Sequence, residues 1–136
     1  MVYFSYIVFV WYYAWYCEEG NNFIESLKFT DCTMSNRINI SSVQLKVLQL
    51  SGYSNLKEVN IDAPNLLSCR YCDNGGGSEP IISFVRSSTQ LEFDLYIPIE
   101  YLDLCNLREF LQNIKPQNVL SSLSIFIFQP TVVSIN

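Results

Sequence analysis

Histidine is absent from the 136 residues, and basic residues are scarce, with 8 Lys and Arg against 13 Asp and Glu. Without histidine, Ser-His and Cys-His catalysis are excluded, and the commonest metal ligand is missing. No constellation of nucleophile, base and orienting group can be assembled from the other residues. The net charge of −5 and the scattered basic residues argue against nucleic-acid binding. We therefore expect no catalytic residues, no metal, no cofactor and no enzymatic activity.

The five cysteines are an odd number, and their spacing matches no small disulfide framework. Reduced thiols in a cytoplasmic or nuclear protein are the expected state. Cys69 and Cys72 form a C-x-x-C, but glycines follow them where a thioredoxin-type site begins a helix. Cys17, Cys32 and Cys105 have no spacing that completes a four-ligand zinc site with them.

Charged residues are also few, at 15% against 49% hydrophobic residues. This composition predicts a folded chain with one hydrophobic core. We divide the sequence into an aromatic segment, residues 1–22, and a repeat region, residues 23–136. The repeat region ends on an apolar strand without a closing cap, which is typical of a truncated solenoid.

The segment from Met1 to Cys17 carries no charge and is rich in aromatic rings. Three interpretations remain open: a membrane anchor, a buried strand pair at the end of the domain, or sequence foreign to the natural protein. A membrane-spanning helix needs about 20 apolar residues, so this run is slightly short. Its aromatic and β-branched residues favour a strand over a helix, and we favour the last two interpretations.

From residue 24 onward the pattern L-x-x-L-x-L recurs, with other apolar residues in place of some leucines. Its copies contain Ile24, Leu27 and Phe29; Leu45, Leu48 and Leu50; Leu56, Val59 and Ile61; and Leu66, Cys69 and Tyr71. The step between the central residues Leu27 and Leu48 defines the repeat unit, and the steps from Leu48 to Val59 and from Val59 to Cys69 are each about half as long. Residues 37–41 alternate like a strand and occupy the missing half-step. A unit of this length predicts an α/β, leucine-rich-repeat solenoid fragment that is β-rich and has at least one short helix.

Alternate residues of a strand face opposite sides, so residues between two core positions face outward. If the copies stack in register, these residues form a polar ladder that suits a protein partner. The expected ladder contains Ser26, Lys28 and Thr30; Val47, Gln49 and Ser51; Glu58, Asn60 and Asp62; and Ser68 and Arg70. A solvated sheet face without a partner is the alternative, and the short half-steps leave open which strands share a side.

The rest of the chain predicts a glycine-rich loop at 73–80 and strands at 81–85, 91–97 and 122–128. Proline should end the second strand. The last strand is apolar on both faces, which indicates an interior position. A helix is expected at 106–115, where Leu107, Phe110, Leu111 and Ile114 share one face. Asn106 is its expected cap, Glu109 completes a capping-box-like pair, and Pro116 should stop it.

The run LKVLQLSGYSNLKEVNIDAPNLLSCRY, residues 45–71, resembles the repeat region of plant F-box/leucine-rich-repeat proteins. NLKEVNIDAPNL, residues 55–66, is its most characteristic part, and the similarity extends over roughly residues 23–128. The resemblance implies that the repeat region presents a surface to a protein target, as in ubiquitin-ligase substrate receptors. Nothing in residues 1–22 resembles the F-box that docks on a Skp-type adaptor, so we do not expect this chain alone to bind one.

These observations predict a non-catalytic protein-binding module whose target is unknown. A small protein anchored in a membrane by residues 1–17 and a truncated product without independent function are the alternatives.

Overall fold

The computed structural model describes residues 25–29, 36–51, 56–73 and 80–129. The interpretations of residues 1–22, the glycines of the expected loop and the ladder residue Thr30 lie outside the described residues.

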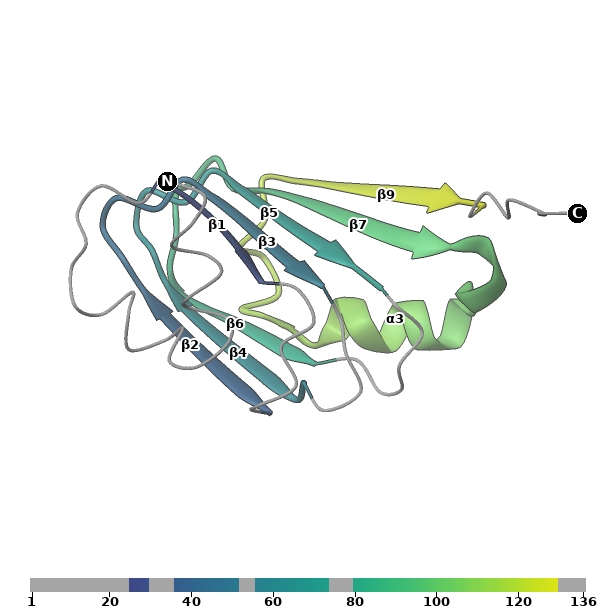
Figure 1. The fold of residues 1–136 in the computed structure, drawn as a ribbon. Coiled ribbons are helices and arrows are strands. Elements are labelled where there is room, and N and C mark those ends of the chain that lie inside the picture. Colours follow the sequence, from purple (N-terminus) through teal and green to yellow (C-terminus); the bar gives the residue numbers. More distant parts are fainter. Residues whose placement is uncertain (1–24, 30–35, 52–55, 74–79, 130–136) are drawn as a thin grey trace, which may run out of the picture.

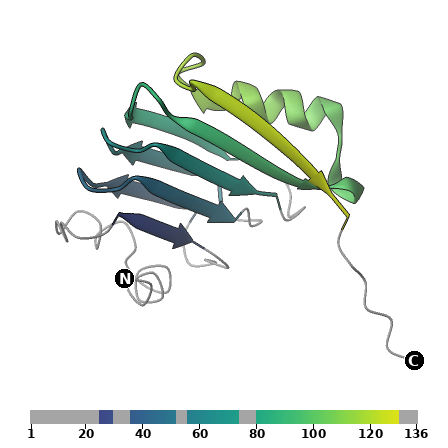
Figure 2. The ribbon, with the colours of Figure 1, turned by 90° about the horizontal axis from the view of Figure 1, so that it is seen from above.

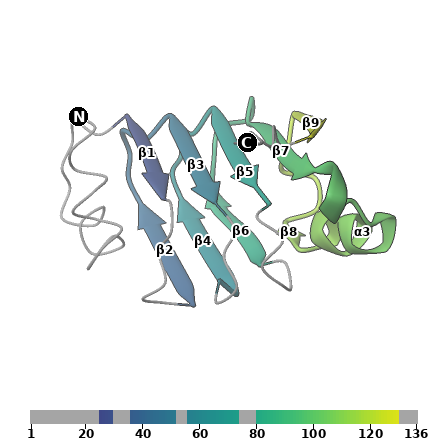
Figure 3. The same cartoon turned by 45° about the vertical axis from the view of Figure 1, so that its right-hand side comes forward.

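Two parallel β-sheets make up most of the described structure, and they lie as two layers (Figure 1). The five-stranded sheet has the order β1 (Ser26–Phe29), β3 (Val47–Ser51), β5 (Ser68–Cys72), β7 (Glu92–Pro98), β9 (Ser122–Phe128). The four-stranded sheet has the order β2 (Arg37–Ser41), β4 (Glu58–Asp62), β6 (Ile81–Arg86), β8 (Ile114–Lys115). Successive strands along the chain therefore enter the two sheets alternately, as Figure 3 shows. The strand expected at residues 37–41 is confirmed, as are those at 81–85, 91–97 and 122–128 to within one residue.

The register of the sheets explains the sequence period. Leu27 pairs with Leu48 and Leu48 with Cys69, so neighbours in the five-stranded sheet lie one full repeat unit apart along the chain. Ile38 and Val59 are paired in the four-stranded sheet at the same spacing. The half-step is thus the passage from one sheet to the other. The later steps between neighbouring strands of the five-stranded sheet are longer. Cys69 pairs with Phe93, and Phe93 pairs with Leu123, which follows the helix-containing segment.

The core lies between the two sheets. The repeat-pattern residues that the structure describes, all those of the four copies except Ile24, have at most 2% of their surface exposed. The strands β1 to β6 bury alternate side chains, as their period of two requires. Both sheets contribute to one hydrophobic cluster, so neither could bury its inner face alone.

A tight turn returns the chain from β4 to β5, and it falls on the D-A-P-N-L phrase. The backbone N–H of Leu66 donates to the carbonyl of Ala63 at 3.0 Å, and Ala63 is fully buried. The amide Nδ2 of Asn65 donates to the carbonyl of Val43 at 2.7 Å, about one unit earlier in the sequence. This phrase therefore closes one turn and ties it to the preceding one.

The helix differs from the prediction at both ends. A short 3-10 turn, η2 (Ile99–Tyr101), leads to α3 (Leu104–Gln112), which begins two residues earlier than expected. Asp103, not Asn106, is the cap, because its Oδ1 accepts hydrogen bonds from the N–H groups of Cys105 and Asn106. The helix ends earlier than Lys115, because Ile114 and Lys115 form β8 and pair with β6.

Phe110 anchors α3 to the core. Its ring lies 4.9 Å from that of Tyr71 and 6.3 Å from that of Phe93, measured between centroids. These contacts fix the helix against the inner side of the five-stranded sheet.

The expectation that strand 122–128 is interior was wrong. β9 is the last of the described strands in its sheet, at the far end from β1 (Figure 2). Leu123 and Ile127 point to the same side as Phe93 and Ile97, but 41% and 50% of their surfaces are exposed. Apolar residues on both faces of a strand do not distinguish a central strand from an uncovered edge.

Candidate partner-binding surfaces

The predicted ladder is divided between the two sheets. Its residues in β1, β3 and β5 lie on the outer face of the five-stranded sheet, whereas Glu58, Asn60 and Asp62 lie on that of the four-stranded sheet. The residues therefore do not form one continuous ladder, and the question of which strands share a side is answered by the two sheets. The physical reason is that copies half a unit apart enter different sheets, and only copies a full unit apart stack.

The outer face of the five-stranded sheet consists of rows that run across the strands. One row joins Lys28, Gln49, Arg70, Asp94 and Ser124. Within it, the Nε of Arg70 lies 3.6 Å from Oδ2 of Asp94. This row has a basic residue at one end and a hydroxyl at the other, with an ion pair between.

The next row becomes aromatic toward β9. It joins Ser51, Cys72, Tyr96 and Phe126. The rings of Tyr96 and Phe126 are stacked, with centroids 4.8 Å apart and an interplanar angle of 14°. Phe126 and its neighbour Phe128 remain 45% and 38% exposed. Aromatic and arginine side chains, such as the partly exposed ring pair and Arg70 in the next row, are enriched in protein interfaces.

Tyr96, Asp94 and Phe126 were not among the predicted ladder residues. The signal that could have found them is the same alternation, because residues 92–98 and 122–128 place every second side chain outward. The prediction stopped at residue 70, where the regular spacing of one unit ends.

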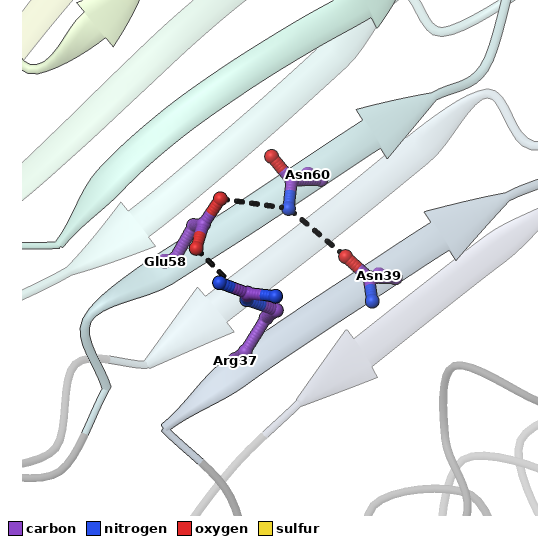
Figure 4. A network of polar contacts seen from close by, with 4 residues as sticks. All are labelled: Arg37, Asn39, Glu58 and Asn60. Atoms are coloured by element: carbon purple, nitrogen blue, oxygen red, sulfur yellow. Dashed lines mark hydrogen bonds and ion pairs between the residues drawn. The ribbon is translucent and has the colours of Figure 1, made fainter.

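The outer face of the four-stranded sheet is a network of mutually bonded polar groups (Figure 4). The Nε of Arg37 lies 2.8 Å from Oε2 of Glu58. The amide Nδ2 of Asn60 donates to Oδ1 of Asn39 at 2.9 Å and to Oε1 of Glu58 at 3.1 Å. The polar side chains of this network therefore bond to one another across the strands.

A second ion pair lies further along the same face. Arg86 donates from Nε to Oδ1 of Asp62 at 2.6 Å and from Nη2 to Oδ2 at 3.1 Å. The hydrogen bond from Arg86 holds the pKa of the Asp62 carboxyl below its ordinary value, against the opposing effect of partial burial. The same hydrogen bond raises the pKa of the Arg86 guanidinium. Both groups are therefore charged at neutral pH, and they neutralise each other.

The C-x-x-C lies on a strand, not at the start of a helix. Cys69 is buried in the core, and burial raises the pKa of its thiol. Cys72 is half-buried on the opposite face, and partial burial also raises the pKa of its thiol. Residues three apart on a strand are about 10 Å apart, which is beyond the reach of a disulfide. Neither thiol has the lowered pKa of a redox site.

A cavity of about 390 Å³ lies between the end of β7 and the start of α3. Its apolar lining comes from residues such as Leu95, Ile97 and Phe110, and Asp73, Glu100 and Asp103 also border it. Asp103 is engaged as the helix cap. The acidic residues there border an apolar hollow, and they do not form a ligand set.

Within the described ranges, no three His, Cys, Asp or Glu side chains are grouped as metal ligands would be. In the same ranges, no helix has both the length and the apolar character needed to cross a membrane.

Comparison with known proteins identifies no relative of this chain. No protein-family model, no curated protein and no solved structure matches the sequence or the fold.

Proposed function

We propose that the chain is a non-catalytic protein-binding module, built as a segment of a leucine-rich-repeat solenoid. Its partner binds the outer face of the five-stranded sheet. The common register of both sheets supports the repeat architecture, because each unit adds one strand to each sheet. Stacked units of this kind bury a continuous core and present an extended surface.

The observation that carries the choice of surface is the aromatic end of the five-stranded sheet. The stacked Tyr96 and Phe126 lie in one row, next to the row of the Arg70–Asp94 ion pair. Aromatic and arginine side chains dominate the energetics of protein interfaces, since they bury large areas at small entropic cost. On the four-stranded sheet, by contrast, the described outward positions of β2, β4 and β6 carry no aromatic ring.

The proposed role matches that of the repeat region in plant F-box/leucine-rich-repeat proteins, which presents a surface to a protein target. In this proposal the chain supplies target recognition alone, and this chain alone does not bind a Skp-type adaptor. A pull-down with purified adaptor should recover no complex with this chain.

The test compares two truncations of exposed apolar side chains, one on each sheet. Tagged full-length protein, its Phe126→Ala variant and its Val85→Ala variant are used for affinity capture from the same extract, with quantitative mass spectrometry. Val85 is a suitable control, since it is 68% exposed on the four-stranded sheet. Loss of an interface anchor of about 1.4 kcal/mol weakens binding about tenfold.

We expect any specific partner to be depleted about tenfold by Phe126→Ala and to be retained by Val85→Ala. A partner that is retained by Phe126→Ala and lost with Val85→Ala would place the binding surface on the other sheet. A partner retained by both variants would show that neither face is used.

A further inference from the structure

Two cations on the outer face of the five-stranded sheet have hydrogen-bond donors that the sheet does not use. Lys28 is exposed, and its ammonium has no ion-pair or hydrogen-bond partner among the described residues. The Nε of Arg70 lies 3.6 Å from Oδ2 of Asp94, which is too far for a hydrogen bond. The arginines of the other sheet differ, because Arg37 and Arg86 donate to carboxylates at 2.8 and 2.6 Å.

These two cations belong to one row, with Gln49 between them. Lys28 pairs with Gln49 and Gln49 with Arg70, on the neighbouring strands β1, β3 and β5 (Figure 3). The amide of Gln49 also has no hydrogen-bond partner among the described residues. Burial and Asp73 raise the pKa of the Cys72 thiol, and the charge of Lys28 opposes them, so the ammonium lies toward the next row. The row therefore presents an ammonium, an amide and a guanidinium side by side.

We propose that this row binds carboxylates, so that the partner contributes an acidic segment in extended conformation. The inference rests on the proposed function, because it names the chemistry of the partner at the same face. The ammonium of Lys28 acts on a carboxylate as a point charge, whereas the planar guanidinium of Arg70 can donate two parallel hydrogen bonds. The whole chain carries a net charge of −5, so its overall field repels an acidic segment, and only this row attracts it.

The outward residues of β7 and β9 set where the acidic part of the partner ends. Glu92 and Asp94 place carboxylates on β7, next to β5. Beyond β5 the next row offers the stacked rings of Tyr96 and Phe126, which suit an apolar side chain. The partner segment should therefore be acidic over β1 to β5 and apolar over β7 and β9.

The spacing of the strands indicates the spacing of the partner's residues. Neighbouring strands lie about 4.8 Å apart, so two strand steps, as between Lys28 and Arg70, cover about 9.6 Å. A polyproline II segment has three residues per turn, and side chains three residues apart lie on the same side, about 9.3 Å from each other. A second pair of strand steps leads from Arg70 to β9. The fitting segment therefore has acidic residues three positions apart and an apolar residue three positions further.

A labelled peptide tests this chemistry directly. The probe is Glu-Pro-Pro-Glu-Pro-Pro-Phe, and the matched peptide has lysine in place of both glutamates. Fluorescence anisotropy is measured as full-length protein is added over a micromolar to submillimolar series. The acidic probe should bind saturably and more weakly as salt is added, and the lysine peptide should not bind. Non-specific attraction to a protein of net charge −5 would favour the lysine peptide, so it cannot produce this preference.

A pair of lysine variants locates the first contact. Lys28→Gln should weaken binding of the acidic probe about threefold, as expected for an exposed ionic contact. Lys57→Gln removes an exposed lysine that precedes β4 in the other sheet, and it should leave the affinity unchanged. Both variants change the net charge equally.

A pair of double variants locates the second contact without changing the net charge. Arg70→Gln/Asp94→Asn removes the guanidinium together with its neighbouring carboxylate, and it should weaken probe binding about tenfold. Arg86→Gln/Asp62→Asn makes the same change on the four-stranded sheet and should have no effect. Circular dichroism checks that each variant is folded.

Three results would overturn the inference: no saturable binding of the acidic probe, equal binding of the lysine peptide, or equal weakening by a variant and its control. Its failure is distinguishable from failure of the proposed function. A captured partner that is lost with Phe126→Ala supports the proposed function whether or not the acidic probe binds. If such a partner is found and the probe does not bind, only the acidic chemistry of the partner is wrong.

Discussion

The outer faces of the two sheets differ in how their polar side chains are used. On the four-stranded sheet, carboxylates, guanidinium groups and amides of neighbouring strands bond to one another, as in the Arg37–Glu58 and Asp62–Arg86 pairs. On the five-stranded sheet, the face changes from Lys28 and Gln49 near β1 to aromatic rings near β9. Both sheets bury their inner residues in one shared core, so the contrast lies in the outward residues.

The contrast has a physical basis in the different constraints on inner and outer positions. Inner positions must be apolar in both sheets because they share a core. Outer positions need not be apolar. An outward side chain that is bonded within the sheet must lose that bond before it binds a partner. In the proposed function, the four-stranded sheet holds the units in register and the five-stranded sheet provides the recognition face.

The largest effects should come from the shared core, and they should be equal in the two sheets. Leu48→Ala in β3 and Ile61→Ala in β4 each remove a side chain that is at most 2% exposed. Each should lower the free energy of unfolding by about 2–5 kcal/mol, measured by urea denaturation. A much smaller loss for Ile61→Ala would mean that the four-stranded sheet is not an equal part of the cooperative core.

The inner and outer faces should also differ in thiol reactivity. Cys105 is exposed and should react first with a thiol reagent, as followed by peptide mass spectrometry. Cys72 should react more slowly, because partial burial raises the pKa of its thiol and lowers the thiolate fraction. Cys69 should react only on unfolding, since it is fully buried. Rapid labelling of Cys69 in native protein would contradict its place in the core.

The core positions could be predicted from the sequence because strand alternation is a local property. Leu27, Leu48 and Cys69 recur once in every unit, and Ile38 and Val59 do the same half a unit away. A single copy of the pattern does not show which sheet its strand joins. The step from the five-stranded to the four-stranded sheet has about the same length as the return step. Sorting the copies by full units would have separated Glu58 from the ladder of β1, β3 and β5.

The errors near the C-terminal end of the described chain have a different cause. Asn106 and Asp103 both have side chains that cap helices, and only the extended backbone of Asp103 selects it. Ile114 has helical spacing from Phe110, but pairing with Ile82 in β6 places it in a strand. For Ile114, a tertiary contact overrides local preference. The aromatic character of the outer face near β9 was visible in the sequence, and only the spacing beyond residue 71 hid its register.

The smallest effect should come from the four-stranded sheet's ion pairs, and it should depend on pH. Asp62→Asn and Arg86→Gln should each destabilise the protein less than either core truncation, because exposed ion pairs contribute little. Their effects should not be additive, since both remove one interaction.

The sign of the pH dependence follows from Asp62. Its folded-state pKa lies below the ordinary value of 3.8, so the contribution of the ion pair is complete above that pH. It is lost as the pH falls through the lower, folded-state pKa, when the carboxylate is protonated. The coupling between Asp62→Asn and Arg86→Gln, from urea denaturation of the four proteins in the cycle, should therefore be constant near neutral pH. It should vanish in strong acid and shrink at high salt. Asp62→Asn combined with Arg37→Gln is the matched control, because Arg37 pairs with Glu58, and these two effects should be additive. A coupling that persists in acid would mean that the two side chains interact by something other than charge.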